Sequence, residues 1–394
     1  MTRHSPTSEA EACAIVAEAA AQRTPLAIQG SGTKRAFGRP PQFELTLSSS
    51  QMTKVTLYEP AEFVISAEPG APLNGIVRLL AEHRQELAFE PLDYRPLLGS
   101  DGEPTIGAVA AMNLSGPRRI AGGSARDSAL GVRFVNGRGE AIKSGGRVMK
   151  NVTGLDLVKL MVGAHGTLGF LTEVTFKVVP SPQRVATLWL VGLSDQTAIA
   201  ALSAALGSPY DISGAAHLPA KIGDGARTLI RVEGFPDSVE YRLGELRSLL
   251  KAFGTAVVLA DDTGRDLWGA IRDATVLAEP RDKAIWRIST APAKGADVAA
   301  RIARTIDARW FFDWGGGLIW LACSTASAAS AATIRAATRE AGGHATLVRA
   351  PEDVRAAVDV FDPPVEAIAR LQTGLKASLD PAGIFNPGRM FPEL

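Results

Sequence analysis

The chain has 394 residues, of which 46% are hydrophobic, and its 42 lysines and arginines nearly balance 41 aspartates and glutamates, giving a formal net charge of +1. This length and composition predict a folded protein with a large core and two domains. The near-neutral charge excludes the global field that collects nucleic acid or acidic lipid, so any anionic ligand must be held locally.

The two cysteines, Cys13 and Cys323, have no CxxC partners, which excludes structural zinc, iron–sulfur clusters and a disulfide framework. A redox function would therefore need an organic cofactor. The first residues, MTRHSPTSEAEACAIV, lack a signal-peptide core, and the uncharged stretch 314–334 is too rich in Gly, Ser, Thr and Ala to span a membrane. We expect a cytoplasmic protein.

A helix is expected over residues 8–22, because Ser8 and Glu11 form a capping-box pattern ahead of an apolar stripe. A proline ends this helix, and residues 25–29 (PLAIQ) predict a short buried strand. The stretch QGSGTKRAFG, residues 29–38, comes next, and RPPQFELTLSSS predicts another strand. The glycine loop is therefore expected to join strand to strand.

This arrangement excludes the dinucleotide fingerprint and the Walker loop, because both need a helix directly after the glycines. Arg35 also stands where the fingerprint would have its third glycine. What remains is a nest of backbone N–H groups that binds phosphate without a helix. An ordinary glycine hairpin explains the loop equally well.

Residues 55–58 and 62–67 alternate like paired strands, and Pro72 opens an expected helix. Glycine then becomes frequent, with 11 of the 48 residues from 99 to 146. Because helical periodicity is almost lacking, this stretch predicts extended backbone that approaches a large planar or phosphorylated ligand. A disordered linker is the alternative, which the regularly spaced apolar residues disfavour.

Residues 161–179 contain a second glycine cluster that runs into an alternating strand. Residues 184–349 then show two β-α-β-β-α-β sets, a repeat at the level of topology. Helices in these sets are expected to begin near Asp195, Asp237, Lys294 and Ala326. Two such ferredoxin-like halves predict one antiparallel sheet with helices on one face. The predicted fold class is therefore α+β.

The chain resembles the FAD-binding domain of the vanillyl-alcohol oxidase/p-cresol methylhydroxylase (PCMH) family in five segments, which follow in this order: PLAIQGSGTK, PTIGAVAAMNLSGPRR, SARDSALGVRFVNGRGE, GAHGTLGFLTEVTFKVVP and LDPAGIFNPGRMF. Within this family it is most similar to the FAD-binding subunits of bacterial glycolate oxidases. The resemblance implies a two-subdomain PCMH-type FAD-binding domain over residues 1–180 and a ferredoxin-like antiparallel-sheet cap over 181–350. It also implies a tail over 351–394 that returns to the first domain.

The resemblance assigns cofactor-binding residues as well. Backbone N–H groups are expected to face the FAD pyrophosphate at Gly30, Ser31, Gly32 and Thr33. The ribityl and ring region is expected to be lined by Thr105, Ile106, Gly107, Asn113, Gly116 and Arg126. The adenine side is expected to be approached by Gly166, Gly169 and Leu171, and Asn386 is expected to close over the cofactor.

The chain departs from the family in two respects. Many relatives attach FAD covalently through a histidine in the first loop, but the loop here reads GSGTK, so we expect non-covalent FAD. Similar 2-hydroxy-acid dehydrogenases hold a divalent metal with clustered histidines, whereas the five histidines here are scattered and the matching region, residues 311–320, offers no metal site. We interpret His165, which lies among glycines, as structural rather than catalytic.

The resemblance implies oxidation of glycolate to glyoxylate by hydride transfer to the flavin N5. This chemistry needs a cation for the carboxylate and a base for the hydroxyl proton. Arg287 is the strongest candidate for the cation, followed by Arg118 and Arg119, for which a surface charge or an FAD-phosphate contact is the preferred interpretation. No convincing base is found. Four tryptophans either face the flavin or, more commonly for sheet residues, belong to the core: Trp286, Trp310, Trp314 and Trp320.

Two classes of function stay open. One is an FAD-dependent subunit of a glycolate oxidase complex that works beside a catalytic FAD-linked subunit and passes electrons to an iron–sulfur subunit. The other is a non-catalytic flavin subunit for electron transfer or assembly, and a stand-alone oxidase of another alcohol such as D-lactate is a third interpretation. Association with the inner membrane is expected only through partners.

Overall fold

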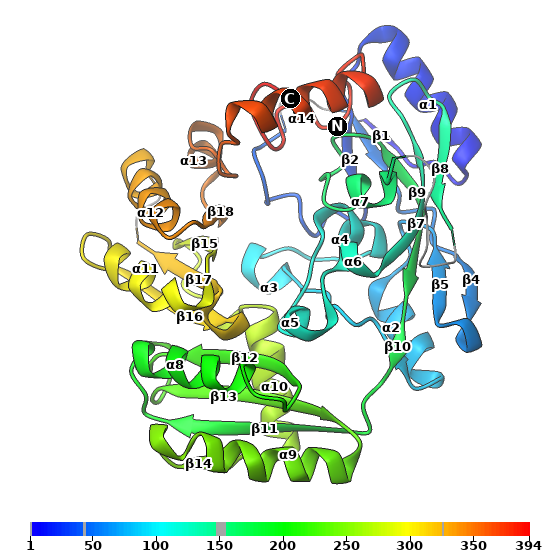
Figure 1. Cartoon of the computed structure of the whole chain (residues 1–394). Coiled ribbons are helices and arrows are strands. Elements are labelled where there is room, and N and C mark those ends of the chain that lie inside the picture. Colours follow the sequence, from blue (N-terminus) through cyan, green and yellow to red (C-terminus); the bar gives the residue numbers. More distant parts are fainter. Residues whose placement is uncertain (1, 42–44, 147–154, 325–326) are drawn as a thin grey trace.

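The computed structural model describes residues 2–41, 45–146, 155–324 and 327–394. Within these ranges the strands form sheets of three, two, five and eight strands. Figure 1 shows the smaller sheets on one side of the molecule and the eight-stranded sheet on the other, with the C-terminal helix α14 (Glu366–Leu379) beside the smaller sheets. The predicted α+β class is confirmed.

The N-terminal sheet is parallel and contains, in spatial order, β1 (Arg3–His4), β3 (Thr46–Ser48) and β2 (Ala27–Gln29). The predicted first helix is confirmed as α1 (Glu9–Gln22), whose N-cap hydroxyl accepts a hydrogen bond from the backbone N–H of Glu11. The glycine loop joins β2 to β3, as predicted. Because these two strands are parallel, the loop is not a hairpin turn, and that interpretation is wrong. Residues 42–44 of the second expected strand lie outside the described residues.

The five-stranded sheet is antiparallel and contains, in order, β4 (Val55–Glu59), β5 (Val64–Ala67), β9 (Phe170–Lys177), β7 (Ala129–Val135) and β8 (Ala141–Gly145). Helix α2 (Leu73–Glu82) follows the expected proline and buries an apolar face. The predicted strands and helix in this part of the chain are confirmed. A short ribbon pairs β10 (Val179–Pro180) with β6 (Gln85–Glu86).

The glycine-rich stretch 99–146 forms the predicted extended backbone only in its last part, over β7 and β8. Between α3 (Arg95–Leu98) and β7 it forms three short helices: α4 (Ile106–Met112), α5 (Arg119–Gly122) and α6 (Ala125–Ser128). A further short helix, α7 (Leu157–Met161), follows β8. Helices of four to seven residues are too short to show a 3.6-residue period, which is why the sequence pattern does not reveal them.

The eight-stranded sheet consists of two β-α-β-β-α-β units, as predicted. The first unit contains β11 (Arg184–Val191), α8 (Asp195–Leu206), β12 (Ile212–Leu218), β13 (Arg227–Gly234), α9 (Pro236–Leu249) and β14 (Ala256–Val258). The second contains β15 (Ala284–Ser289), α11 (Gly295–Ile302), β16 (Ala308–Asp313), β17 (Leu318–Cys323), α12 (Ala328–Glu340) and β18 (His344–Arg349). The strand order β14-β11-β13-β12-β16-β17-β15-β18 joins the units edge to edge through β12 and β16. The expected start of the last helix, Ala326, lies outside the described residues.

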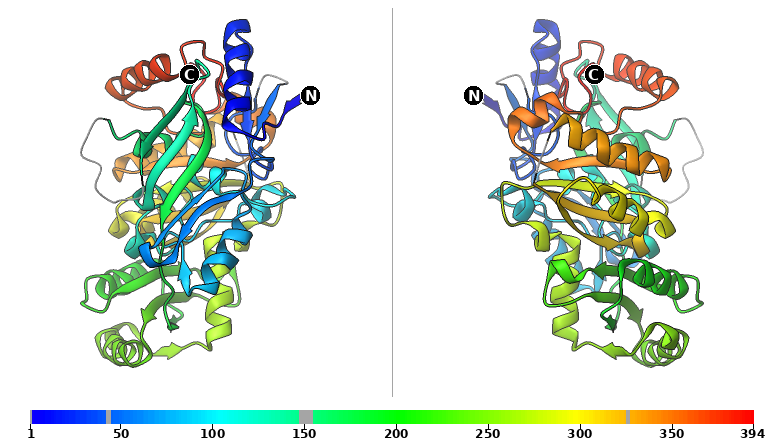
Figure 2. Two further views of the ribbon diagram at one scale, coloured as in Figure 1. Left: turned by 90° about the vertical axis from the view of Figure 1, so that its right-hand side faces the viewer. Right: turned by 90° about the vertical axis from the view of Figure 1, so that its left-hand side faces the viewer.

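Helix α10 (Asp261–Arg272) is absent from the predicted elements and corrects the expectation that helices cover only one face of this sheet. The helices α8, α11 and α12 lie on the face turned away from the smaller sheets, as Figure 2 shows. The apolar side of α10 instead packs into the core on the opposite face, where Trp268 is buried and donates a hydrogen bond to Thr187 Oγ1 at 3.0 Å.

One hydrophobic core connects the inner face of the large sheet with the smaller sheets, since Phe134, Leu229 and Trp320 belong to the same buried cluster. After α13 (Glu352–Ala357) and α14, the tail returns to the N-terminal sheet, where Leu26 N–H donates to the Ile384 carbonyl at 2.7 Å. Within the described ranges, no helix combines the length and the apolar character needed to cross a membrane.

Candidate functional site

Two adjoining cavities lie between the glycine loop, α4 and the large sheet. The larger has a volume of about 520 Å³ and the smaller a volume of about 120 Å³. Phe37, Met112 and His165 line both of them. None of the described residues that line either cavity is an aspartate or a glutamate. Because the two cavities share lining residues, we treat them as one candidate site, and the lack of carboxylates suits this site to an anionic ligand.

The smaller cavity is bordered by the loop between β2 and β3. It is lined by Lys34 and by the predicted loop residues Gly30, Ser31, Gly32 and Thr33. The Thr105 hydroxyl is buried at this cavity and has no hydrogen-bond partner among the described residues. A buried hydroxyl without a partner is costly, so this atom indicates a missing polar ligand.

Lys34 is absent from the predicted site residues, although it directly follows the G-S-G-T sequence. Its side chain is 7% exposed, and its Nζ donates a hydrogen bond to Thr33 Oγ1 at 3.3 Å. Burial lowers the pKa of Lys34 to about 8, although Asp93 acts in the opposite direction. Near neutral pH the lysine is still charged, so it places a cation beside the loop.

The glycines at this cavity are required mainly by packing within the protein. A Cβ at Gly30 would lie 2.5 Å from Thr105 Oγ1, and a Cβ at Gly107 would lie 2.4 Å from Pro69 Cβ. Gly32 differs, because the nearest atom to a Cβ there would be 3.9 Å away, and its φ of +90° is the feature that favours glycine. Packing within the protein is therefore sufficient to require glycine at Gly30 and Gly107, which both line the smaller cavity.

The Asn386 side chain ties three backbone segments together. Its Oδ1 accepts a hydrogen bond from Ile28 N–H at 2.9 Å, and its Nδ2 donates to the His165 carbonyl, also at 2.9 Å. A Cβ at Gly166 would come within 2.9 Å of the same Nδ2. Asn386 lines the smaller cavity, but its amide is occupied in holding β2 against the turn at residues 165–166.

The larger cavity gathers basic side chains from several elements. They are Arg119, Arg126, Lys159, Arg287, His344 and Lys376. Lys376 is already paired, because its Nζ lies 2.8 Å from Asp380 Oδ2. Asn113 caps the end of α4, and its Oδ1 accepts a hydrogen bond from Arg126 N–H at 2.9 Å, which brings these two predicted residues together. Burial lowers the pKa of Arg287.

The structure brings most predicted site residues to the two cavities, with two exceptions. The smaller cavity is lined by Gly30, Ser31, Gly32, Thr33, Thr105, Gly107, Gly166, Gly169, Leu171 and Asn386. The larger is lined by Asn113, Arg126 and Arg287. Ile106 and Gly116 line neither cavity: Ile106 is buried in the core, and the Gly116 carbonyl accepts a hydrogen bond from Trp314 Nε1 at 3.1 Å.

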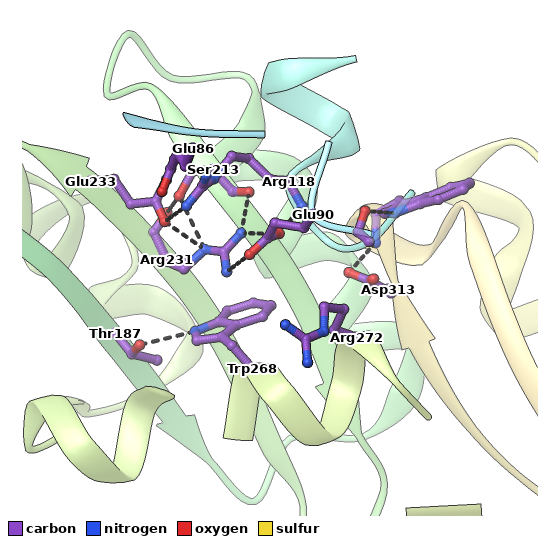
Figure 3. A network of polar contacts seen from close by, with 12 residues as sticks. Glu86, Glu90, Arg118, Thr187, Ser213, Arg231, Glu233, Trp268, Arg272 and Asp313 are labelled. Carbon is purple, nitrogen blue, oxygen red and sulfur yellow. Dashed lines mark hydrogen bonds and ion pairs between the residues drawn. The ribbon is translucent and has the colours of Figure 1, made fainter. Parts of the chain in front are cut away.

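Arg118 belongs to a buried ion-pair network and not to the cavity wall (Figure 3). Its guanidinium contacts Glu86 and lies 2.8 Å from Glu233 Oε1, while Arg231 lies 2.8 Å from Glu90 Oε2. Burial raises the pKa of Glu86 to about 7. The network joins residues 86–118 to β13, so it fixes the large sheet onto the smaller ones.

His165 is enclosed by aromatic rings. It stacks on Phe37 with ring centroids 5.8 Å apart and lies edge-on to Phe361 at 5.0 Å. Burial, with a smaller effect from Arg389, lowers the pKa of His165 to about 4, so the imidazole is neutral near pH 7. These contacts fit the structural interpretation of this histidine. Across the described residues, no three His, Cys, Asp or Glu side chains are grouped to hold a metal ion.

None of the four tryptophans considered from the sequence lines either cavity. Trp286 and Trp320 are each 1% exposed and belong to the core. Trp310 donates its indole N–H to Asp195 Oδ2 at 2.8 Å, on the outer part of the sheet. Trp314 lies next to the larger cavity, behind two of the arginines that line it.

Comparison with known proteins shows to which class of proteins this chain belongs. Residues 4–145 match the sequence family described as an FAD binding domain. The fold is similar to that of p-cresol methylhydroxylase with substrate bound, with a TM-score of 0.73 and 13% identity over 99% of this chain and 88% of that one. It is also similar to 4-ethylphenol oxidase from Gulosibacter chungangensis, with a TM-score of 0.72 and 16% identity over 99% of this chain and 89% of that one. The class is that of FAD-dependent oxidoreductases with a PCMH-type domain.

Two curated relatives narrow this class. The chain is 35% identical to glycolate oxidase subunit GlcE of Escherichia coli (strain K12) over 96% of each chain. It is 26% identical to glycolate oxidase subunit GlcD of Bacillus subtilis (strain 168) over 98% of this chain and 88% of that one. The chain therefore belongs to the family of FAD-dependent oxidoreductases that contains these glycolate oxidase subunits.

The candidate site fits the FAD cofactor of this family. The smaller cavity offers the unpartnered Thr105 hydroxyl, the backbone of the glycine loop and the buried Lys34 cation to a pyrophosphate. The larger cavity has room for a planar ring and presents Phe37 and Tyr94 together with several cations.

Proposed function

We propose that this chain is the FAD-binding subunit of a complex that oxidises glycolate to glyoxylate. The observation that carries the proposal is the larger cavity, which gathers cations and has no acidic side chain among its described lining residues. A small 2-hydroxy acid carries one carboxylate, and cations in such a cavity can pair with it. The similarity to glycolate oxidase subunits supports this substrate. We also propose that residues 1–180 and 351–394 hold the cofactor and that residues 181–350 form the cap.

FAD, when bound, supplies an acceptor for a hydride from the carbon that carries the hydroxyl group. The loop from Gly30 to Thr33 and the Lys34 ammonium would hold the pyrophosphate. Arg287, on β15, would pair with the substrate carboxylate from the cap side of the larger cavity. The first loop offers no histidine, which favours non-covalent attachment of FAD.

His344 is our candidate for the proton acceptor that the sequence does not reveal. It lies at the start of β18 and lines the larger cavity. Burial lowers its pKa, and the positive charge of Arg287 adds to the effect, so the imidazole is neutral near pH 7. A neutral imidazole can accept the hydroxyl proton as the neighbouring C–H bond breaks.

The electrons must then leave the chain, and we propose an iron–sulfur subunit as their acceptor. The two cysteines of the sequence, Cys13 and Cys323, are too few to hold a cluster of this kind. Both curated relatives are named as subunits, which favours a complex with a further FAD-linked subunit. Any membrane contact would come through these partners.

Anaerobic addition of glycolate to the purified, FAD-loaded chain tests the proposal. Bleaching of the flavin absorbance is the expected result. A flavin that stays oxidised with glycolate and with D-lactate would refute substrate oxidation by this chain and favour the electron-transfer or assembly role. Bleaching by D-lactate alone would reassign the substrate. Acid precipitation should release the flavin into the supernatant, and flavin that stays in the pellet would contradict non-covalent binding.

A further inference from the structure

Two guanidinium groups from different parts of the chain meet on one indole ring. Arg119 belongs to α5, which precedes β7 in the chain and packs against β12 of the large sheet, and Arg287 belongs to β15 of that sheet. Their guanidinium carbons lie 4.7 Å and 5.0 Å from the centre of the Trp314 ring. Both arginines line the larger cavity, whereas Trp314 does not. The indole therefore holds both guanidinium groups by cation–π contacts without lining the cavity itself.

Within the described part of the chain, the carboxylates of Asp127 and Asp313 act on these two cations only at longer range. Neither guanidinium forms an ion pair with a described carboxylate, in contrast to Arg118, which pairs with two. Burial lowers the pKa of Arg119, and the nearby Arg287 lowers it further. Two like charges held close together without a carboxylate in direct contact are unfavourable, so this arrangement indicates an anionic ligand.

The position of Trp314 is fixed by both parts of the molecule. Its backbone N–H donates to Asp313 Oδ1 at 2.7 Å, and its indole Nε1 donates to the Gly116 carbonyl at 3.1 Å. Gly116 lies three residues before Arg119, in the segment that leads into α5. Trp314 also has a φ of +53°, a conformation that a bulky residue keeps only where its surroundings impose it.

We propose that Trp314 is a positioning residue that holds Arg119 and Arg287 as a two-cation site for the carboxylate of the substrate. This inference rests on the proposed function and adds Arg119 and Trp314 to it. The site is complete only when α5 is docked on the large sheet, because α5 contributes one cation and β15 contributes the other. The pyrophosphate is assigned to the smaller cavity, so the anion expected here is the substrate.

Three variants test this role: Trp314→Phe, Trp314→Leu and Arg119→Gln. The matched control is Trp310→Phe, since Trp310 also lies near a cation, Lys221 at 5.9 Å, and donates its indole N–H to a side chain. The FAD-loaded full chain is titrated with oxalate, a carboxylate that carries no oxidisable C–H bond, and the change in flavin absorbance gives the dissociation constant. The KM and kcat for glycolate and the affinity for FAD are measured on the same proteins.

We expect Trp314→Leu and Arg119→Gln to raise the dissociation constant of oxalate and the KM for glycolate at least tenfold, with FAD affinity unchanged. Trp314→Phe keeps an aromatic ring but loses the bond to Gly116, so its effect should be smaller, and the Trp310→Phe control should match the unsubstituted chain. Unchanged oxalate binding in Trp314→Phe and Arg119→Gln would overturn the inference even if Trp314→Leu fails to fold. An equal loss of FAD affinity would assign the two cations to the flavin instead. Oxalate binding without reduction by glycolate would refute the proposed reaction and leave the two-cation site standing.

Discussion

Replacing Lys34 with methionine should have opposite effects on the stability of the apoprotein and on its affinity for FAD. The side chain is 7% exposed, and burial lowers its pKa from 10.5 to about 8. At 1.36 kcal/mol per pKa unit, the charged form is destabilised by about 3 kcal/mol in the apoprotein. Methionine has a similar length and no charge, so it removes this cost near neutral pH.

The sign of the pH dependence follows from the lowered pKa. Between about pH 8 and pH 10.5 the unfolded chain binds the Lys34 proton and the folded chain does not, so apoprotein stability rises with pH in this window. The Lys34→Met variant should therefore be more stable than the unsubstituted apoprotein at pH 7, by up to about 3 kcal/mol, and the difference should vanish near pH 10.5. FAD affinity should fall by up to about a hundredfold at pH 7, because the pyrophosphate loses its buried cation.

Denaturant unfolding of the apoprotein at pH 7 and pH 9.5, with FAD titrations at the same pH values, measures both effects. In the unsubstituted chain, FAD should bind more weakly as the pH rises above about 8, and this dependence should be lost in Lys34→Met. The exposed Lys54 provides the control, since Lys54→Met should change neither quantity. A Lys34→Met apoprotein that is less stable at pH 7, or that binds FAD with unchanged affinity, would refute the reasoning.

Three further predictions concern the cavity wall and the buried charges. In Gly30→Ala, the new methyl group would lie 2.5 Å from Thr105 Oγ1 and displace that hydroxyl. FAD affinity, measured by calorimetric titration, should fall about tenfold, because one hydrogen bond to a charged group is lost. Unchanged affinity would contradict this role of the hydroxyl. Arg231→Leu removes the ion-pair partner of the buried Glu90 carboxylate, which keeps the hydrogen bond from Arg118 N–H, and should cost about 3 kcal/mol of stability. Most of this loss should be restored in Arg231→Leu/Glu90→Leu, and a double variant with additive losses would argue against the pair. Burial raises the pKa of Asp313 to about 7, so this group makes the free energy of unfolding fall as the pH rises from about 4 to about 7. In Asp313→Asn, the free energy of unfolding should depend less steeply on pH over that range. An unaltered pH dependence would mean that Asp313 titrates normally.

The sequence predicts the elements whose patterns are local and long enough to recognise. The capped first helix, the strand that enters the glycine loop and the repeated β-α-β-β-α-β sets of residues 184–349 are all present. The short helices of residues 106–128 and the parallel pairing of β2 with β3 are not predicted. The short helices contain too few residues to show a repeating helical pattern, and the parallel pairing depends on contacts between segments that are distant along the chain.

The candidate site, like the fold, is predicted from the sequence only in part. The glycine-rich segments resemble those of the PCMH-type family, and this resemblance implies a flavin nucleotide held by backbone groups. Most of the residues named from the sequence line the two cavities. The burial of Lys34 and the support of two arginines by Trp314 are not predicted, since both arise from packing between distant segments.

The neighbours Arg118 and Arg119 show most clearly what the sequence determined and what it left to the tertiary structure. The sequence by itself supplies two adjacent cations after a glycine-rich segment and gives no reason to separate them. In the folded chain, Arg118 is neutralised by Glu86 and Glu233, whereas Arg119 faces the larger cavity without a carboxylate partner among the described residues. Adjacent side chains on a short helix point in different directions, so their surroundings, and with them their roles, are decided by the elements that pack on each side.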